Sequence, residues 1–277
     1  MSQLQMQTKM SNTIRFLAAD MVQRANSGHP GMPMGLADIM TVFSEYYRHN
    51  PKNSKWLNRD RVVFSGGHGS ALIYSMLHLW GYDLSIDDLK NFRQLDSKTP
   101  GHPESTHTDG IEVTTGPLGQ GVANAVGFSM ASQHASHLLN SDEAKFIDHK
   151  VYCFCGDGDL EEGISYEACS MAGHNNCDNL VLIYDSNNIT IEGDTDISIS
   201  ENIELRFTSQ GWDVITIDGH NFNEITNAFE SAQKQTKPLL IIAKTKIGRG
   251  AATMEGSHHT HGAPLGEEEL KASKEKA

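Results

Sequence analysis

The chain has 277 residues, and its 22 Lys and Arg against 35 Asp and Glu give a formal net charge of −13. A hydrophobic share of 38% supports a complete core and excludes a disordered chain. The acidic balance excludes a general nucleic-acid binder and a protein that binds anionic membranes, because both partners require a basic surface. No apolar run approaches the roughly 20 residues that span a bilayer, and residues 1–25 lack the apolar region of a signal peptide. We therefore expect a soluble cytoplasmic protein with no nucleic-acid or membrane partner.

Short apolar runs alternate with longer segments of helical period along most of the chain. The predicted strands are 61–64, 151–155, 180–184, 214–217 and 239–243, and the predicted helices are 11–25, 35–48, 70–80, 121–139, 160–172 and 223–234. Near-continuous apolar strands are typical of parallel sheets that are buried on both faces. Together with the interleaved helices they predict an α/β fold, in which a doubly wound and mainly parallel sheet carries helices on both faces.

No internal repeat or linker divides the chain before its last dozen residues, so we assign residues 1–265 to one domain. Residues 266–277 are polar and highly charged, which predicts a surface tail, either helical or frayed. The four cysteines, at positions 153, 155, 169 and 177, match neither a zinc ligand set nor a redox CxxC pair. We expect buried thiols.

Gly and His residues gather in seven turns. These are SGHPGMPMG (27–35), SGGHGSALIYS (65–75), KTPGHPE (98–104), TTGPLGQG (114–121), GDGDLEEG (156–163), YDSNNITIEG (184–193) and GSHHTHGAPLG (256–266). Any one of them could be an ordinary surface turn. Several follow a predicted strand and precede a predicted helix, which places them at the carboxyl edge of the sheet, where open α/β folds bind ligands.

The GDG turn carries the most chemistry. Asp157 follows one predicted strand, and Asn187 lies thirty residues later, at the end of the next. One Asp carboxylate, one Asn carboxamide oxygen, a backbone carbonyl, two phosphate oxygens and a water would complete the octahedron that Mg²⁺ prefers. Alternatively, Asp157 caps a helix and Asn187 forms an Asx turn. The occurrence of the two motifs at successive strand ends favours the metal site.

GDG with the Asn187-Asn188 pair is similar to the thiamine-diphosphate signature. Together with SGHPG, GGHGSALIYS, TPGHPE, TTGPLGQG and HGAPLG, it makes residues 10–266 resemble the diphosphate-binding half of transketolase. The resemblance implies that Asp157, Asn187 and the backbone carbonyl of Ile189 hold Mg²⁺, or Ca²⁺ in its place. It also implies that Gly156 and Gly158 let the diphosphate of thiamine diphosphate approach the backbone.

Four histidines match family positions in these motifs. The resemblance places His68 and His261 around the diphosphate and the reacting carbon, and His29 and His102 along the substrate channel. Imidazole suits such a site, because ketol transfer moves protons on and off hydroxyl and carbonyl oxygens. The carbanion chemistry itself belongs to the cofactor.

The resemblance also gives roles to one loop and one acid. The segment Gly116-Pro117-Leu118 matches the loop that contacts the aminopyrimidine ring, and Glu162 matches a glutamate at the dimer interface. Eight other histidines match no motif and are interpreted as surface or core residues: His49, His78, His107, His134, His137, His149, His174 and His220. His258 and His259 adjoin His261 but lie outside its HGAPL motif, so they are interpreted as loop residues. Arg93, Lys244 and Lys246 could contact phosphates, but we expect solvated surface.

Transketolases are normally more than twice this long, and their second half completes the active site. The resemblance therefore implies either a split enzyme, whose C-terminal subunit is separate and forms a homodimer or heterotetramer with this chain, or a piece of a longer chain. The charged residues 267–277 favour the natural subunit. The implied activity is transfer of a two-carbon ketol unit between sugar phosphates, as in the pentose phosphate pathway. The alternatives are a component of a 2-oxoacid dehydrogenase or deoxyxylulose-phosphate synthase, which TPGHPE and HGAPLG disfavour, and an inactive orphan half.

Overall fold

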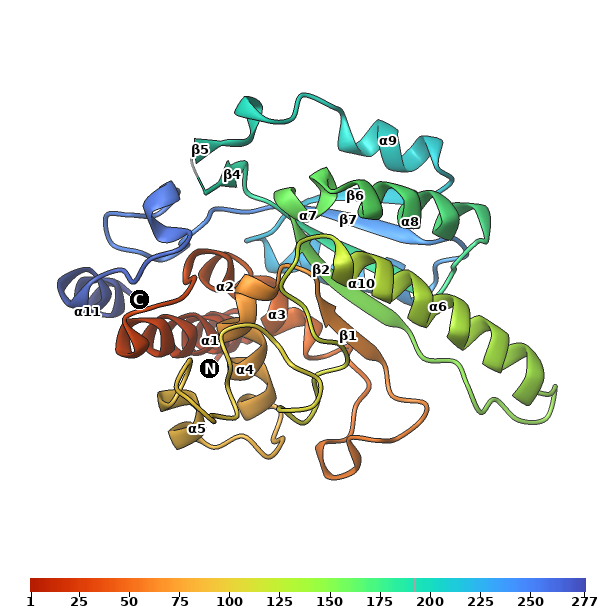
Figure 1. The fold of residues 1–277 in the computed structure, drawn as a ribbon, viewed down its shortest axis with the longest axis horizontal. Helices are drawn as coiled ribbons and strands as arrows, with labels where there is room; N and C mark the ends of the chain where they lie inside the picture. Colours follow the sequence, from red (N-terminus) through yellow and green to blue (C-terminus); the bar gives the residue numbers. More distant parts are fainter. Residues whose placement is uncertain (192) are drawn as a thin grey trace.

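The computed structural model describes residues 1–191 and 193–277, and in these residues five parallel strands form the central sheet in the order β1-β2-β3-β7-β6 (Figure 1). The strands are β1 (Arg61–Phe64), β2 (Val151–Gly156), β3 (Leu180–Ser186), β6 (Asp213–Asp218) and β7 (Leu239–Lys244). All the predicted strands are present, and the near-continuous burial of β2, β3 and β7 agrees with a sheet covered on both faces. A short antiparallel pair, β4 (Ile189–Thr190) and β5 (Gly193–Asp194), follows β3.

The larger part of the core lies on one face of the sheet. The helices there are α1 (Gln3–Ala25), α2 (Gly31–Gly35), α3 (Ala37–Phe43), α4 (Ser70–Leu79), α5 (Ile86–Lys90) and α10 (Phe222–Gln233). They pack against the strand residues that point to this side, among them Tyr152, Phe154 and Ile183. Phe43 is fully buried at the centre of this cluster, with ring centroids 4.9 Å from Tyr152 and 5.4 Å from Phe154.

The opposite face is covered by α6 (Gln120–Leu139), α8 (Gly163–His174) and α9 (Ile203–Ser209), with the short α7 (Asp157–Glu161) at the strand ends (Figure 1). The alternate strand residues point to this side, including Cys153 and Cys155. All four cysteines are buried free thiols within this second cluster, as expected. The predicted α/β fold with helices on both faces is therefore confirmed.

Two of the predicted helices are wrong as single elements. Residues 35–48 were expected to form one helix, but α2 and α3 occupy 31–43 and are separated by Leu36. Residues 160–172 were expected to form another, but α7 ends at Glu161 because Glu162 is extended, with ψ 135°. The helices α5 and α9 were not predicted, since five and seven residues are too few to display a helical period. Single 3-10 turns lie at Pro51–Asn53, Gly67–Gly69, Thr195–Ile197 and His258–Thr260.

The charged C-terminal segment is a helix, α11 (Glu267–Lys276), which packs beside α1 (Figure 1). Leu270 is buried in a small cluster with Ala19 and Met34, and the N–H of Gly266 donates to Gln23 Oε1 at 2.8 Å. The division of the chain at residue 265 stays a prediction. Among the described residues, no helix combines the length and apolar character needed to cross a membrane.

Candidate active site

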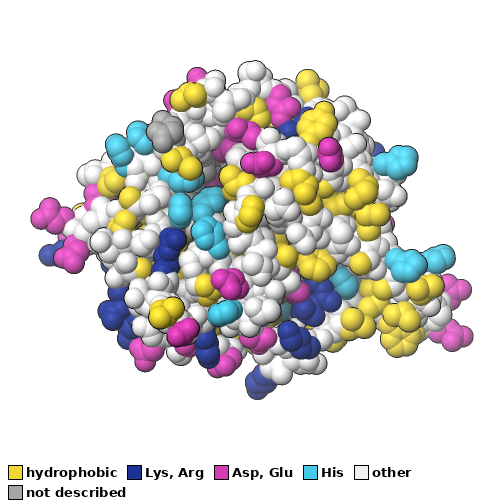
Figure 2. Space-filling view, viewed as in Figure 1, with side chains coloured by type: hydrophobic (Ala, Val, Ile, Leu, Met, Phe, Trp, Pro, Cys, Tyr) yellow, Lys and Arg dark blue, Asp and Glu magenta, His cyan; other side chains and the backbone are white. Residues whose placement is uncertain are grey.

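The carboxyl ends of β1, β2 and β3 open into a cleft of about 580 Å³. Figure 2 shows histidine side chains gathered at a hollow on this face of the molecule. Of the residues predicted for the site, all but Pro117 line the cleft: His29, His68, His102, Gly116, Leu118, Gly156, Asp157, Gly158, Glu162, Asn187, Ile189 and His261. The structure thus brings together residues from all seven of the Gly- and His-bearing turns.

Asp157 stands where β2 ends and α7 begins, and its side chain is buried. The hydroxyl of Tyr184 donates to Asp157 Oδ1, whereas Oδ2 is buried with no hydrogen-bond partner among the described residues. Burial raises the pKa of this carboxyl to about 6, against the lowering effect of the Tyr184 hydrogen bond. A buried carboxylate oxygen without a donor is suited to a cation.

Asn187 is held by hydrogen bonds on both sides of its amide. Its Nδ2 donates to Asp185 Oδ2 at 2.9 Å, and its Oδ1 accepts from the N–H of Ile189 at 2.9 Å. Asp185 is itself buried and accepts from the hydroxyl of Thr245, and burial raises the pKa of this carboxyl to about 7. The Asx turn considered from the sequence is therefore present. It leaves a second lone pair on Asn187 Oδ1, so it is compatible with a metal ligand.

A second aspartate of the GDGD turn joins three of the motifs. Asp159 Oδ1 accepts from the hydroxyl of Ser65 at 2.7 Å and from the N–H of Gly119 at 2.8 Å, and its Oδ2 accepts from the N–H of Gly156 at 2.9 Å. The packing is close, since a Cβ on Gly121 would lie 2.4 Å from Ser65 Cα. Asp159 therefore fixes the GDG turn relative to the turn after β1 and the start of α6.

The sequence analysis assigned no role to Asp159, Asp185 or Tyr184. The available signals were an acid two residues after Asp157 and an acid at the end of an apolar strand. Neither signal distinguishes a buried acid that organises a turn from one that caps a helix, so only the structure reveals their hydrogen bonds.

Three of the predicted histidines form a triangle. The ring centroids of His29, His68 and His261 are separated by 5.2 to 5.5 Å, and the ring of His102 lies beside Gly116. Burial is the main cause that lowers the pKa of His68 to about 3 and that of His29 to about 4, and it also lowers the pKa of His102 and His261. All four imidazoles are therefore neutral near pH 7, and each offers one hydrogen-bond donor and one acceptor.

The remaining candidates fall outside the cleft or at its edge. His258 and His259 are exposed and do not line it, as expected for loop residues. Glu162 lines the cleft and is exposed. Arg93 was expected on the solvated surface, and this expectation is wrong because the side chain is half-buried. The YDSNNITIEG motif includes residue 192, which lies outside the described residues.

The comparisons with known proteins decide the family. A family model described as "Transketolase, thiamine diphosphate binding domain" matches residues 6–277. The chain belongs to this family. The transketolase of Campylobacter jejuni has a crystal structure that superposes with a TM-score of 0.96 at 64% identity, over 99% of this chain and 43% of that one.

Other transketolases give the same result. A Pichia stipitis transketolase structure in complex with sedoheptulose-7-phosphate has a TM-score of 0.96 at 47% identity, over 98% of this chain and 40% of that one. The Bacillus subtilis transketolase is 54% identical over 266 residues, which are 95% of this chain and 40% of that protein. This transketolase domain thus spans about 40% of the length of these relatives, and the predicted resemblance and fold are confirmed.

Proposed function

We propose that this transketolase domain holds Mg²⁺ and the diphosphate of thiamine diphosphate in its cleft and supplies part of the active site of a transketolase. The observation that carries this proposal is the position of Asp157: its carboxyl is buried, one of its oxygens has no hydrogen-bond partner among the described residues, and it lies in the same cleft as a triangle of neutral histidines. The reaction is transfer of a two-carbon ketol unit between sugar phosphates. Sedoheptulose-7-phosphate, bound by the related Pichia stipitis enzyme, is a substrate of this chemical class.

The donor set fits a hard divalent cation. It consists of the Asp157 carboxylate, the Asn187 carboxamide oxygen and the backbone carbonyl of Ile189, and Mg²⁺ and Ca²⁺ both prefer oxygen ligands. Asp157 needs a positive charge nearby, because burial makes its ionised form costly. Binding of the cation would require little reorganisation of Asn187, because hydrogen bonds to Asp185 and Ile189 already orient its amide.

The backbone around GDG leaves room for a diphosphate. Among the described residues, a Cβ on Gly156 would meet only Asp159 Oδ2, at 4.0 Å, so this glycine leaves space in the cleft. A Cβ on Gly158 would instead lie 2.9 Å from Leu118 Cδ1, where the TTGPLGQG loop packs against the turn. We infer that the first glycine admits the phosphates, and that the second lets the Leu118 loop close over the turn.

Thiamine diphosphate, when bound, supplies the carbon-centred chemistry of the reaction. The chain contributes neutral imidazoles, and we infer that His29 and His102 hydrogen-bond the hydroxyl and carbonyl oxygens of the sugar. We assign His68 and His261 to the region between the diphosphate and the reacting carbon. A neutral imidazole accepts a proton at one ring nitrogen and donates one from the other, so these residues can move protons in both directions of the transfer.

A C-terminal part completes the enzyme in our proposal, because this domain spans about 40% of its relatives. Exposed apolar side chains lie on the adjacent helices α6 and α8, and Leu138, Tyr166 and Met171 are 67%, 51% and 45% exposed. We propose that this face and Glu162 meet the C-terminal part, which is a separate subunit in a homodimer or heterotetramer. Cytoplasmic sugar-phosphate metabolism of the pentose phosphate type is the setting that this activity implies.

Calorimetry tests the proposed cofactor site on this chain. Thiamine diphosphate is titrated into the protein with Mg²⁺ and, separately, with EDTA. We expect binding only with the metal, loss of that binding in Asp157→Ala, and no change in Asp142→Ala, which removes an exposed acid from a distant loop. Equal affinity with and without Mg²⁺ would contradict the proposed site.

A further inference from the structure

Arg93 has an unusual backbone conformation, and its side chain occupies an unusual position. It is a non-glycine residue with φ +61°, and its N–H donates to the carbonyl of Thr99 at 2.9 Å, which closes the loop between α5 and the TPGHPE turn. A left-handed conformation at a residue with a long side chain costs about 1 kcal/mol, and such strain persists only where the surroundings impose it. The loop therefore aims this side chain in one direction.

The guanidinium lies against two glycines that directly precede histidines of the cleft. A Cβ on Gly101 would lie 2.9 Å from Arg93 Nε and 3.0 Å from Nη2, and a Cβ on Gly28 would lie 3.4 Å from Nη1. Gly28 also has φ +130°, and its Cβ would lie 3.0 Å from Phe92 Cε1. A side chain at position 101 would displace the arginine, and one at position 28 would press on Phe92 while the guanidinium stays in van der Waals contact. The SGHPG and TPGHPE turns therefore meet across the Arg93 side chain.

The charge of Arg93 affects the pKa of both His29 and His102. Burial is the largest cause that lowers the pKa of His29, followed by the neighbouring His261 and then by the charge of Arg93. For His102, burial is again the largest cause, and the charge of Arg93 is the second. The other titratable groups that face His29 are His68 and His102, which are themselves neutral. Among the described residues, the guanidinium donates no hydrogen bond and forms no ion pair that would neutralise it.

We propose that Arg93 is a positioning residue of this cleft: lying between Gly28 and Gly101, it sets the spacing of the turns that carry His29 and His102, and its positive charge adds to burial in disfavouring the protonated form of both imidazoles. The role matters for catalysis only if the proposed function holds, because a protonated imidazole has no acceptor nitrogen for a sugar hydroxyl. The electrostatic effect itself is a property of this chain without cofactor or partner.

The test follows the imidazole ¹³Cε1 signals of the chain by NMR as pH is lowered, with His29 and His102 assigned from His29→Gln and His102→Gln. Arg93→Met removes the charge and keeps an extended side chain, and Arg93→Lys keeps the charge. We expect Arg93→Met to raise the titration midpoints of both histidines by on the order of 0.5 unit, and Arg93→Lys to leave them near the wild-type values. High salt should reduce the difference between the two variants.

Two controls distinguish an effect of the Arg93 charge from a general disturbance of the fold. The signal of His137, exposed at the end of α6, should stay unchanged in both variants. Gly101→Ala, which forces the guanidinium away from its seat, should raise the midpoint of His102 without any change of charge in the sequence. Unchanged midpoints in Arg93→Met, or equal shifts in the methionine and lysine variants, would overturn the proposal. None of these measurements requires thiamine diphosphate, so a failed cofactor titration would leave this result intact.

Discussion

Three aspartates close to the cleft have the same chemistry and different surroundings. In the part of the chain that the structure describes, one oxygen of Asp157 has no donor, whereas both oxygens of Asp159 accept hydrogen bonds, from backbone N–H groups and a serine hydroxyl. Asp185 directs its carboxyl to the amide of Asn187 and to Thr245. The first arrangement is suited to a ligand, and the other two organise loops. Residue type alone could not have separated them.

Asp159→Asn should lower the free energy of unfolding by about 2–4 kcal/mol, because an amide nitrogen then faces N–H donors in a buried site. The loss should appear as a lower midpoint in urea denaturation, with little change in slope. Asp142→Asn, at an exposed loop position, should leave the midpoint unchanged. A variant at position 159 as stable as the wild type would show that these three hydrogen bonds do not hold the turn.

His102→Ala should slow ketol transfer by on the order of 10²–10⁴ in the reconstituted enzyme while cofactor affinity changes little. The reason is its position, since His102 lies beside Gly116 on a loop of its own, outside the histidine triangle. Steady-state kinetics and thiamine diphosphate titration on the same preparation measure both quantities. If cofactor binding and turnover fall together, the assignment of His102 to the sugar is wrong.

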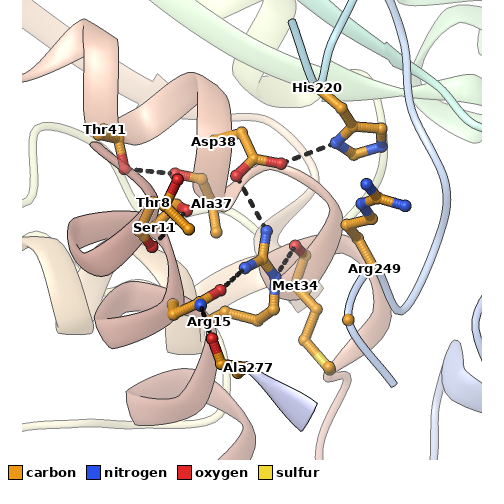
Figure 3. Close-up of polar contacts among 12 residues, drawn as sticks. Thr8, Ser11, Arg15, Met34, Ala37, Asp38, Thr41, His220, Arg249 and Ala277 are labelled. Atoms are coloured by element: carbon orange, nitrogen blue, oxygen red, sulfur yellow. Dashed lines mark hydrogen bonds and ion pairs between the residues drawn. The ribbon is translucent and has the colours of Figure 1, made fainter. Parts of the chain in front are cut away.

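At the scale of elements, a network of buried polar side chains connects α1 and α3 to His220, in the loop after β6 (Figure 3). Arg15 of α1 and His220 both contact Asp38 of α3, at 3.0 and 2.8 Å. His220 Nε2 accepts from the N–H of Lys246 at 3.0 Å, so its Nδ1 carries the proton and donates to Asp38. Ile247, which follows Lys246 in the chain, lines the cleft, so this network supports one wall of the site.

Asp38→Asn should therefore destabilise the fold by about 3 kcal/mol, since it leaves the buried Arg15 guanidinium without its counter-charge. Burial favours the neutral acid, but the His220 hydrogen bond and the Arg15 charge hold the pKa of Asp38 below its usual value. Thermal unfolding measures the loss, and Asp213→Asn on the exposed end of β6 serves as the matched control. Equal unfolding temperatures for the two variants would contradict the structural role of the network.

The elements that sequence pattern predicted well are the strands, because buried apolar runs bounded by Gly, Asp and Asn have few alternative interpretations. Helix boundaries were less accurate at two places: α2 ends at Gly35, just before Leu36, and the extended Glu162 separates α7 from α8. The charged period of α11 gave no sign of docking, since only Leu270 and Ser273 are buried within it. Its packing beside α1 depends on tertiary contacts, which sequence pattern does not contain.

At the scale of the whole molecule, buried neutral histidines couple stability to pH. Burial, together with the charges of Arg61, Arg48 and Arg59, lowers the pKa of His149 to about 4, and the side chain is 5% exposed. The unfolded chain, with an ordinary pKa of about 6.5, therefore takes up this proton first as the pH falls. The contribution of neutral His149 to the free energy of unfolding is therefore complete above pH 6.5 and is lost progressively as the pH falls toward 4.

His149→Gln should remove part of the acid destabilisation, on the order of 1–2 kcal/mol at pH 5 relative to pH 7. Urea denaturation at the two pH values gives the difference, and His137→Gln, at an exposed position on α6, should leave it unchanged. The partly buried His29 and His68 have pKa values lowered in the same direction, so some pH dependence should persist in the variant. Identical pH dependence in the wild type and His149→Gln would contradict this account.

The ordered motifs predicted which residues gather at the sheet edge, because turns after parallel strands share one edge whatever the details of packing. They did not predict what orients those residues. Hydrogen bonds join Asp159 to Ser65, 94 residues away, and Asp185 to Thr245, 60 residues away. The Arg93 side chain lies against Gly28, 65 residues earlier in the chain. Such contacts leave no periodic signal in a single sequence.

The central claim is that this domain is one part of a divided active site, and reconstitution tests it most directly. The C-terminal part of the Campylobacter jejuni transketolase, expressed as a separate chain, provides the complement, since that enzyme is 64% identical over this domain. A coupled assay measures glyceraldehyde-3-phosphate release from xylulose-5-phosphate and ribose-5-phosphate, with thiamine diphosphate and Mg²⁺ in excess. We predict little turnover by this chain alone, and activity that rises on titration and saturates near a one-to-one ratio. Full turnover by this chain alone, or none in a mixture that binds the cofactor, would contradict the account.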